Sequence, residues 1–252
     1  MMQQLLQIDE ARRLDDAISN KGNSPILNSL DNPENALRFM RSCLRGSYLF
    51  GRFVVPSYLS HVFASLTNRH PTSNTTGKIV KEVTDFCLGE LATNNVSGVK
   101  ATYHAHYYDL LNAYDTAGGD ITEFNIAIEP AIEYLVSDGY QGVFNSFWSE
   151  ASLKYASRLM EVCNDPLQSF ILMPCNERLT TIVYPVALKS LCREKRFDKF
   201  RHFMDVHIQL DQDDHSVAAM KWLEFYLESD VSSAAVQQAT EEVLKLYEKE
   251  KV

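Results

Sequence analysis

Residues 203–215 read FMDVHIQLDQDDH and hold two of the seven histidines of the chain. Within this stretch, His207, Asp211 and His215 recur at every fourth residue. On an α-helix this spacing places them along one stripe, with each step about 6 Å along the helix axis. An imidazole and a carboxylate one turn apart can bind the same transition metal ion. The outer histidines are about 12 Å apart, so the stripe is either a site for two ions that flank Asp211 or a solvated polar face.

The bulk composition is that of an ordinary globular protein, with 45% hydrophobic and 23% charged residues among 252. A chain of this length can bury a substantial core, and we expect one domain over residues 1–252. The net charge of −9 argues against nucleic acid and anionic membranes as partners, because both attract lysine and arginine. No apolar run approaches the roughly 18 residues that a membrane-spanning helix needs.

The N-terminal sequence and the cysteines predict a cytoplasmic location. Residues 1–10 lack the basic start and the long apolar core of a signal peptide. The five cysteines are dispersed without paired spacing, which is typical of reduced thiols rather than of a disulfide framework.

The spacing of apolar residues is helical in almost every segment, and no alternating strand pattern extends over more than a few residues. Gly46, Gly51 and Pro56 predict a bend or break in the second long helix. The pattern therefore predicts an all-α bundle. The expected helices cover residues 4–19, 33–66, 78–92, 99–116, 122–137, 139–162, 166–193 and 232–251, with a loop at 68–77.

Three short motifs mark helix starts, because a polar capping residue followed by proline is typical of a first helical turn. They are Asn23-Ser24-Pro25, Asp31-Asn32-Pro33 and Asn164-Asp165-Pro166. Pro174 and Pro185 stand inside the helix that the last motif begins, and they predict kinks in it.

Outside residues 203–215, the histidines that could reach a core site are few. His104 and His106 are two residues apart, so they face opposite sides of the predicted helix. His106 shares a face with Leu110 and Ala113 and is the better inward candidate. A single core histidine is more often structural than a metal ligand, so His106 alone decides nothing.

Two acidic residues are candidate ligands. Glu177 lies within the apolar run 170–179, where a buried carboxylate would need a partner, either Arg178 or a metal ion. Glu90 follows the apolar residues 86–89, and it is either a ligand or an exposed acid in the last turn of a helix.

Other common types of site are not indicated. Gly118-Gly119 stands alone between helices and does not form a phosphate-binding loop. There is no Cys-x-x-Cys pair for structural zinc and no Gly-x-Ser-x-Gly nucleophile motif. The basic residues in 189–201 are interspersed with acids, which is typical of a solvated turn.

The late histidine motif resembles that of the haem-oxygenase-like diiron oxidase and oxygenase superfamily, and more closely a bacterial branch of it. Members of this superfamily have a late helix with the pattern His-x3-Asp followed by two or three residues and a second histidine. His207, Asp211 and His215 match this pattern in its longer form.

The resemblance extends over most of the chain. Glu177 lies thirty residues before His207 and is similar to the mid-chain glutamate of the family. His106 and Glu90 match its early histidine and early glutamate. The sequence departs from the branch at Leu91, where a second acid is usual.

The resemblance implies an all-α, haem-oxygenase-like helical bundle that is a non-haem diiron enzyme. It would bind two iron ions, or alternatively manganese, and use O2 to oxidise a small amine, amino acid or fatty acid. The outcome would be N-oxygenation, C–C cleavage or oxidative decarboxylation. The implied metal ligands are Glu90, His106, Glu177, His207, Asp211 and His215.

Haem is not expected, because haem oxygenases bind it through a histidine near the N-terminus and the first sixty residues here contain none. Helix faces suggest Tyr103, Phe147 and Trp148 as residues of a substrate pocket. The oligomeric state is open, with a homodimer as one option.

Two other functions remain open on the same fold. A cofactor-free enzyme, similar to the thiamin-degrading relatives, would need Cys87, Cys163 or Cys175 as a nucleophile in the pocket. A non-catalytic interaction protein, similar to the superfamily member that binds death domains, would need a large exposed apolar patch.

Overall fold

The computed structural model describes residues 2–67, 74–91, 93–94, 103–104, 106–122, 124, 148–210, 215–228 and 231–248. These residues are helical apart from turns and one short antiparallel pairing. In that pairing, β1 (Thr93–Asn94) lies beside β2 (Tyr103–His104), with Thr93 opposite His104. The expectation of an all-α protein is confirmed.

The elements follow one another along the chain with short connections. They are α1 (Met2–Leu6), α2 (Asp9–Asn20), η1 (Lys21–Asn23), η2 (Pro25–Asn28), α3 (Pro33–Leu49), η3 (Phe50–Val54), α4 (Val55–Thr67), α5 (Asn74–Leu91), β1, β2, α6 (His106–Thr116), α8 (Glu150–Asn164), α9 (Pro166–Ser190), η4 (Lys195–Phe197), α10 (Asp198–Leu210), α11 (Ser216–Leu227) and α12 (Ser233–Tyr247).

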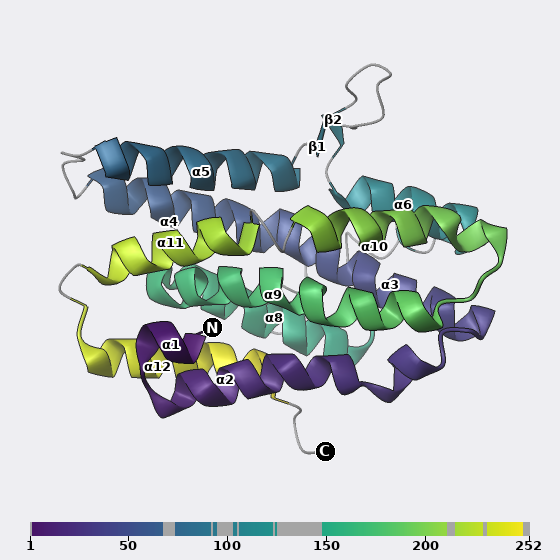
Figure 1. Cartoon of the computed structure of the whole chain (residues 1–252), viewed down its shortest axis with the longest axis horizontal. Helices are drawn as coiled ribbons and strands as arrows, with labels where there is room; N and C mark the ends of the chain where they lie inside the picture. The colour runs from purple at the N-terminus through teal and green to yellow at the C-terminus, as the bar shows by residue number, and fades with distance from the viewer. Residues whose placement is uncertain are drawn as a thin grey trace.

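Helix α9 lies in the middle of the bundle. It packs against α2, α4, α8, α10, α11 and α12, and Figure 1 shows helices on both sides of it. Its residues 169–175 are all buried, as expected for a helix that is apolar on every side. The helix continues through Pro174 and Pro185, so neither proline ends it.

Two of the three predicted helix starts have side-chain caps, whereas Ser24, before η2, makes no capping hydrogen bond with its side chain. Asn32 Oδ1 accepts hydrogen bonds from the N–H groups of Glu34 (2.9 Å) and Asn35 (3.2 Å) at the start of α3. At the start of α9, Asp165 Oδ1 accepts from the N–H of Gln168 at 2.8 Å. In both helices a proline occupies the first turn, where its missing N–H needs no partner.

The expected helix over residues 4–19 is wrong, because the chain forms two helices there. Gln7 adopts a left-handed backbone with φ of +54° and separates α1 from α2. The short α1 folds back onto α2, and Asp15 of α2 accepts hydrogen bonds from the N–H groups of Met2 and Gln3. Asp15 also pairs with Arg178 of α9, so one carboxylate joins three helices.

The pKa of Asp15 has consequences for stability. Burial would raise this pKa, but hydrogen bonds from Gln3 and Met2 and the charge of Arg178 hold it below its usual value. A carboxyl whose pKa is lower in the folded state stabilises the fold above its unfolded pKa of about 4. This stabilisation is lost as the pH falls from about 4 through the pKa of Asp15 in the folded protein.

Asp15→Asn should therefore lower the free energy of unfolding by about 2 kcal/mol at pH 7, because it weakens the cap of α1 and leaves Arg178 without its anion. Asp16→Asn is the matched control, since Asp16 is the exposed neighbour. Urea unfolding should show the difference between wild type and Asp15→Asn shrinking below about pH 4. A difference that stays constant down to pH 2 would contradict the assigned role.

Two other expected helices begin later than predicted. The helix over 99–116 begins at His106, because Tyr103 and His104 pair with β1 instead. The expected continuous helix over 139–162 is also wrong, since α8 begins at Glu150. Ser149 has an extended backbone there and its Oγ accepts from the N–H of Ser152 at 3.2 Å. Residues 125–147 and 68–73 lie outside the described part of the chain.

The predicted bend in the second long helix is a π-helical segment. Element η3 joins α3 to α4 while the backbone remains helical at Phe50 and Val55. The N–H of Val55 donates to the carbonyl of Phe50, five residues earlier, which is the hydrogen bond of a π-helix. The segment therefore accommodates an additional residue and changes the direction in which α4 presents its side chains.

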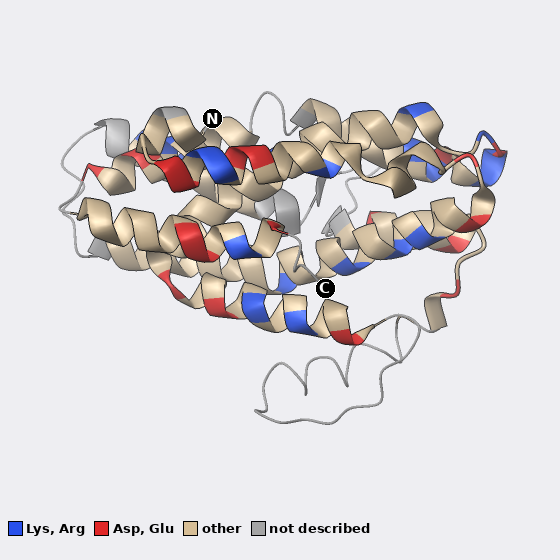
Figure 2. Cartoon of the chain, turned by 90° about the horizontal axis from the view of Figure 1, so that it is seen from below, with Lys and Arg blue, Asp and Glu red and all other residues tan. Residues whose placement is uncertain are grey.

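Charged residues lie on the outer faces of the helices, with both signs interspersed (Figure 2). The basic residues near η4 donate hydrogen bonds to backbone carbonyls. Arg196 donates to the carbonyl of Ala117 at 3.2 Å and Arg201 to that of Cys192 at 2.7 Å. Among the described residues, no helix combines the length and apolar character needed to cross a membrane.

Candidate metal centre

Glu177 and His215 form a buried pair. Glu177 lies in the middle of α9 and is 4% exposed, and His215 immediately precedes α11 and is 9% exposed. Glu177 Oε2 is 3.4 Å from His215 Nδ1. A carboxylate in such apolar surroundings costs free energy unless a partner compensates it, and here an imidazole lies beside it.

Arg178, the other partner that the sequence suggests for Glu177, points elsewhere. Its guanidinium pairs with Asp15 and lies 3.3 Å from the hydroxyl of Ser19, both on α2. Successive residues of a helix point about 100° apart, so Glu177 and Arg178 lie on different faces of α9. Glu177 is thus directed at α11 and Arg178 at α2.

His207 on α10 is also buried, at 9% exposed. Its Nδ1 lies 2.8 Å from the carbonyl oxygen of Phe203, one turn earlier. Because a carbonyl only accepts, Nδ1 carries the proton, and Nε2 is the nitrogen that could bind a metal. The ring is held between Phe203, at 4.0 Å between ring centres, and Tyr184, at 6.2 Å.

The two histidines lie at different levels along α9. His207 is beside Tyr184, whereas His215 is beside Glu177, seven residues earlier on the same helix. Seven residues of α-helix span about 10 Å, so the two histidines are about two turns apart along α9. His207 belongs to α10 and His215 precedes α11, and the predicted stripe between them runs through residues outside the described part. Asp211, the predicted residue between them, lies outside the described part of the chain, as do Asp213 and Asp214.

The two early candidate ligands stand at helix ends, Glu90 in the last turn of α5 and His106 at the start of α6. Phe86 of α5 lies 4.8 Å from the His215 ring, and Glu90 is one turn further along α5. His106 is the first residue of α6, which packs on α10. The side chains of Glu90 and His106 lie outside the described part of the structure.

The register between α6 and α10 places the backbone of His106 near the end of α10. Lys199 Nζ donates to Asn112 Oδ1 at 3.0 Å, and the two helices run in opposite directions (Figure 1). Six residues before Asn112 in α6 is His106, and six residues after Lys199 in α10 is Asp205. His106 is therefore level with Asp205, which is two residues before His207. Figure 1 shows the end of α5, the start of α6 and the facing ends of α10 and α11 above the middle of α9.

Within the described residues, no three histidine, cysteine or acidic side chains are close enough to hold a metal ion. The structure brings Glu177 and His215 into contact and sets His207 on the neighbouring helix. The other three predicted ligands have no described side chain.

The three predicted pocket residues are placed differently. Trp148 is 2% exposed and packs edge-on against Tyr48 at the end of α3, with 6.5 Å between ring centres. It belongs to an aromatic cluster that includes Phe124. Tyr103 lies in β2, with its side chain outside the described part, and Phe147 is outside it altogether.

The thiols are poorly suited to act as nucleophiles. Burial raises the pKa of Cys163 to about 12 and that of Cys43 to about 12, and it also raises the pKa of Cys175. The thiolate is the reactive form, so little of it exists at neutral pH in any of the three. Cys87 is fully buried beside Phe86.

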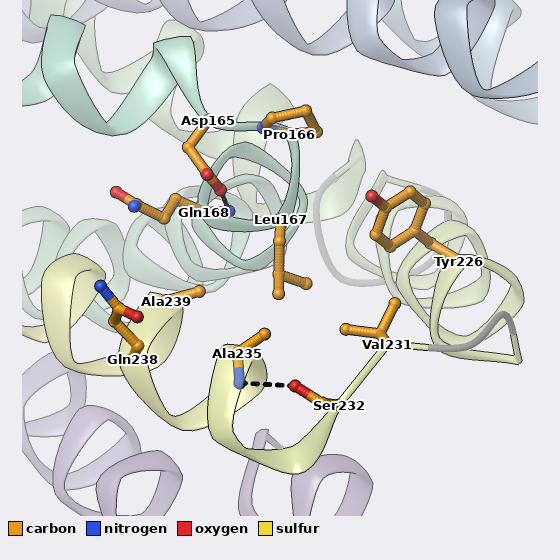
Figure 3. Close-up of a pocket in the computed structure, with 10 residues that line it drawn as sticks. All are labelled: Asp165, Pro166, Leu167, Gln168, Tyr226, Val231, Ser232, Ala235, Gln238 and Ala239. Carbon is orange, nitrogen blue, oxygen red and sulfur yellow. Dashed lines mark hydrogen bonds between the residues drawn. The ribbon is translucent and has the colours of Figure 1, made fainter.

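A cavity of about 460 Å³ opens where α9 and α12 begin, far from Glu177. Figure 3 shows Leu167 and Tyr226 beside the capping residues of the two helices, Asp165 and Ser232. Asp165 is twelve residues from Glu177, which is about 18 Å along α9. This cavity is therefore separate from the Glu177–His215 pair.

Sequence reasoning did not select one fully buried polar residue, Tyr58 of α4. Burial, with the charges of Cys87 and Glu177 in support, raises the pKa of its phenol well above the usual value. Nothing in the sequence distinguishes it from other core tyrosines, because the π-helical segment η3 determines where α4 directs it.

Comparison of the chain with protein-family models, with curated proteins and with solved structures gives no match. The function is therefore inferred from the residues of the site and their geometry.

Proposed function

We propose that this protein is a non-haem diiron oxidase or oxygenase on a haem-oxygenase-like helical bundle. The observation that carries the proposal is the buried Glu177–His215 pair with His207 on the adjoining helix. These three residues come from the middle of α9, the end of α10 and the start of α11. Buried carboxylates and imidazoles of this kind are the ligands that non-haem iron and manganese take in proteins.

The residues present fit such a metal pair. Glu177 offers a carboxylate that is already desolvated, and the carbonyl of Phe203 holds the proton of His207 on Nδ1, which orients Nε2 for binding. The proposed ligands that complete the set are Glu90, His106 and Asp211. Two ferrous ions, when bound, would supply the electrons that activate O2.

The surrounding side chains would keep water out of the site. Phe86 covers His215, while Phe203 and Tyr184 enclose His207. An apolar enclosure favours a small substrate with an aliphatic part, such as an amine, an amino acid or a fatty acid. The enclosure contains no basic residue among these contacts, so we propose no recognition of phosphate esters.

The alternative functions have less support from the described residues. Cysteine catalysis is disfavoured by the raised thiol pKa values. Among the described residues, the exposed large apolar side chains come from five different elements. They are Ile26, Phe63, Tyr108, Tyr155 and Val217.

The proposal predicts that anaerobic addition of Fe(II) loads about two irons per chain, measured by metal analysis after desalting. His207→Ala and Asp211→Ala should each lose at least one iron, because each removes a ligand. His202→Ala and Asp205→Ala are matched controls, since both residues are exposed on α10. Wild-type stoichiometry in both ligand variants would refute the diiron proposal.

A further inference from the structure

The cavity of about 460 Å³ where α9 and α12 begin has the size of a pocket for a small molecule, since such pockets span about 300–1,000 Å³. The start of α9 contributes Asp165 and Leu167, and the end of α11 contributes Tyr226. Val231, before α12, and Ala235, in its first turn, complete the apolar part of the lining. In Figure 3 the side chains of Leu167, Val231 and Ala235 point toward a common space. This surface suits an aliphatic group.

Asp165 is the only charged side chain among the described residues that line the cavity. Its Oδ1 accepts a hydrogen bond from the N–H of Gln168 at 2.8 Å. The carboxylate has no ion-pair partner within the described part of the chain, which leaves Oδ2 available to a ligand. A half-buried carboxylate without a cation favours a ligand that brings a positive charge.

The two helix starts at the cavity are not arranged to bind an anion. Free backbone N–H groups at a helix start attract anions, but Pro166 has no N–H and that of Gln168 is bonded to Asp165. At the start of α12, Ser232 Oγ accepts from the N–H of Ala235 at 3.2 Å. No lysine, arginine or histidine is among the described lining residues. An anionic ligand would therefore meet a negative charge without a compensating positive one.

The other polar groups of the lining are compatible with a cation that donates hydrogen bonds. The side-chain amides of Gln168 and Gln238 offer oxygen acceptors, and an ammonium group carries three donors. The aromatic ring of Tyr226 can attract a cation as well. The net charge of −9 raises the local concentration of cations around the whole chain.

We propose that this cavity binds a small organic ammonium ion, with the ammonium group beside Asp165 and the alkyl part against Leu167 and Val231. The cavity is separated from the Glu177–His215 pair by about 18 Å along α9. The inference therefore does not rest on the proposed function, and each can fail without the other.

The first test measures the binding of matched probes to the metal-free protein by saturation-transfer NMR titration. Hexylammonium, 1-hexanol and hexanoate share an alkyl chain and differ in the charge of the head group. Hexylammonium should bind about tenfold more tightly than hexanol, because its hydrogen bond to the carboxylate is charge-assisted. Hexanoate should bind more weakly than hexanol. Equal affinity for hexylammonium and hexanol, or no binding of hexylammonium, would overturn the inference.

The second test removes the charge of Asp165. Asp165→Asn preserves the cap of α9, since asparagine and aspartate cap helices equally well. It should weaken hexylammonium binding about tenfold and leave hexanol binding unchanged. Asp198→Asn is the matched control, because Asp198 is an exposed acid at the start of α10, beyond the other end of α9. Wild-type affinity for hexylammonium in Asp165→Asn would show that this carboxylate does not hold the ammonium group.

The third test locates the ligand without changing any charge. Ala235→Leu should fill part of the cavity and weaken hexylammonium binding at least about tenfold, because the side chain of Ala235 points into it. Ala235 is exposed, so the larger side chain needs no rearrangement of the core. Ala234→Leu, at an exposed neighbouring position, should bind as the wild type does. Unchanged binding in Ala235→Leu, with a wild-type melting temperature, would mean that the ammonium ion binds elsewhere and would refute the proposed site.

Discussion

Glu177→Gln should abolish binding of at least one iron while leaving the protein folded. The amide has the shape of the carboxylate but no charge, and neutral amides are poor ligands for iron compared with carboxylates. The substitution also removes the cost of keeping a charge buried at 4% exposure, which offsets the weaker interaction with His215. We therefore expect the free energy of unfolding of the metal-free protein to change by less than about 1.5 kcal/mol.

The matched control is Glu224→Gln, which makes the same chemical change at an exposed position of α11. Iron content and urea unfolding should both remain at wild-type values in this variant. If Glu177→Gln retained full iron content, Glu177 would be a structural partner of His215 and not a ligand. If it failed to fold, Glu177→Asp would still report on iron, because it keeps the charge and shifts its position.

Gly119→Ala should destabilise the protein by about 3 kcal/mol. A Cβ at this position would clash with the ring carbons of Tyr114, so the aromatic ring would have to move. Tyr114 is 1% exposed, and its hydroxyl accepts a hydrogen bond from Arg41 Nε at 3.1 Å. Displacing the ring would therefore disturb the contact between α3 and α6 as well as the packing around it.

Gly46→Ala is the control for this substitution. Gly46 lies inside α3 with no atom within 4 Å of an added Cβ, so alanine should stabilise the helix by up to about 1 kcal/mol. Urea unfolding of both variants measures the two effects. Equal and small changes in the two would mean that the close approach of Gly119 to Tyr114 does not constrain the fold.

The parts of the fold that the sequence predicts are those decided by neighbouring residues. Asn32 and Asp165 cap the helices that follow them through hydrogen bonds that span two or three residues. The combination of a capping side chain and a following proline is visible in the sequence. The all-α class follows from apolar periodicity, which is equally local.

The parts that the sequence does not predict depend on distant residues. The left-handed backbone at Gln7 allows α1 to return to Asp15, and no local pattern indicates that contact. The pairing of Tyr103 with β1 likewise replaces a helical turn by a contact with a segment nine residues earlier in the chain. In both places a tertiary contact overrides helical periodicity.

The same distinction applies to the candidate site. Spacing alone selected His207 and His215, and the apolar run around Glu177 predicted its burial, which the structure confirms. The sequence could not decide between Arg178 and other partners for Glu177, because that choice depends on the position of α2. Tyr58 could not be selected at all, because its direction depends on the π-helical hydrogen bond of Val55.

The π-helical segment η3 at residues 50–54 also makes the packing of α4 sensitive to the removal of a residue at this place. Removing one residue there would restore ordinary α-helical pairing and rotate everything downstream in α4 by about 100° relative to α3. Tyr58 and Val62, both fully buried, would then leave the core together. A one-residue deletion in η3 would thus reorient all the side chains of α4, whereas a point substitution there would alter only one side chain.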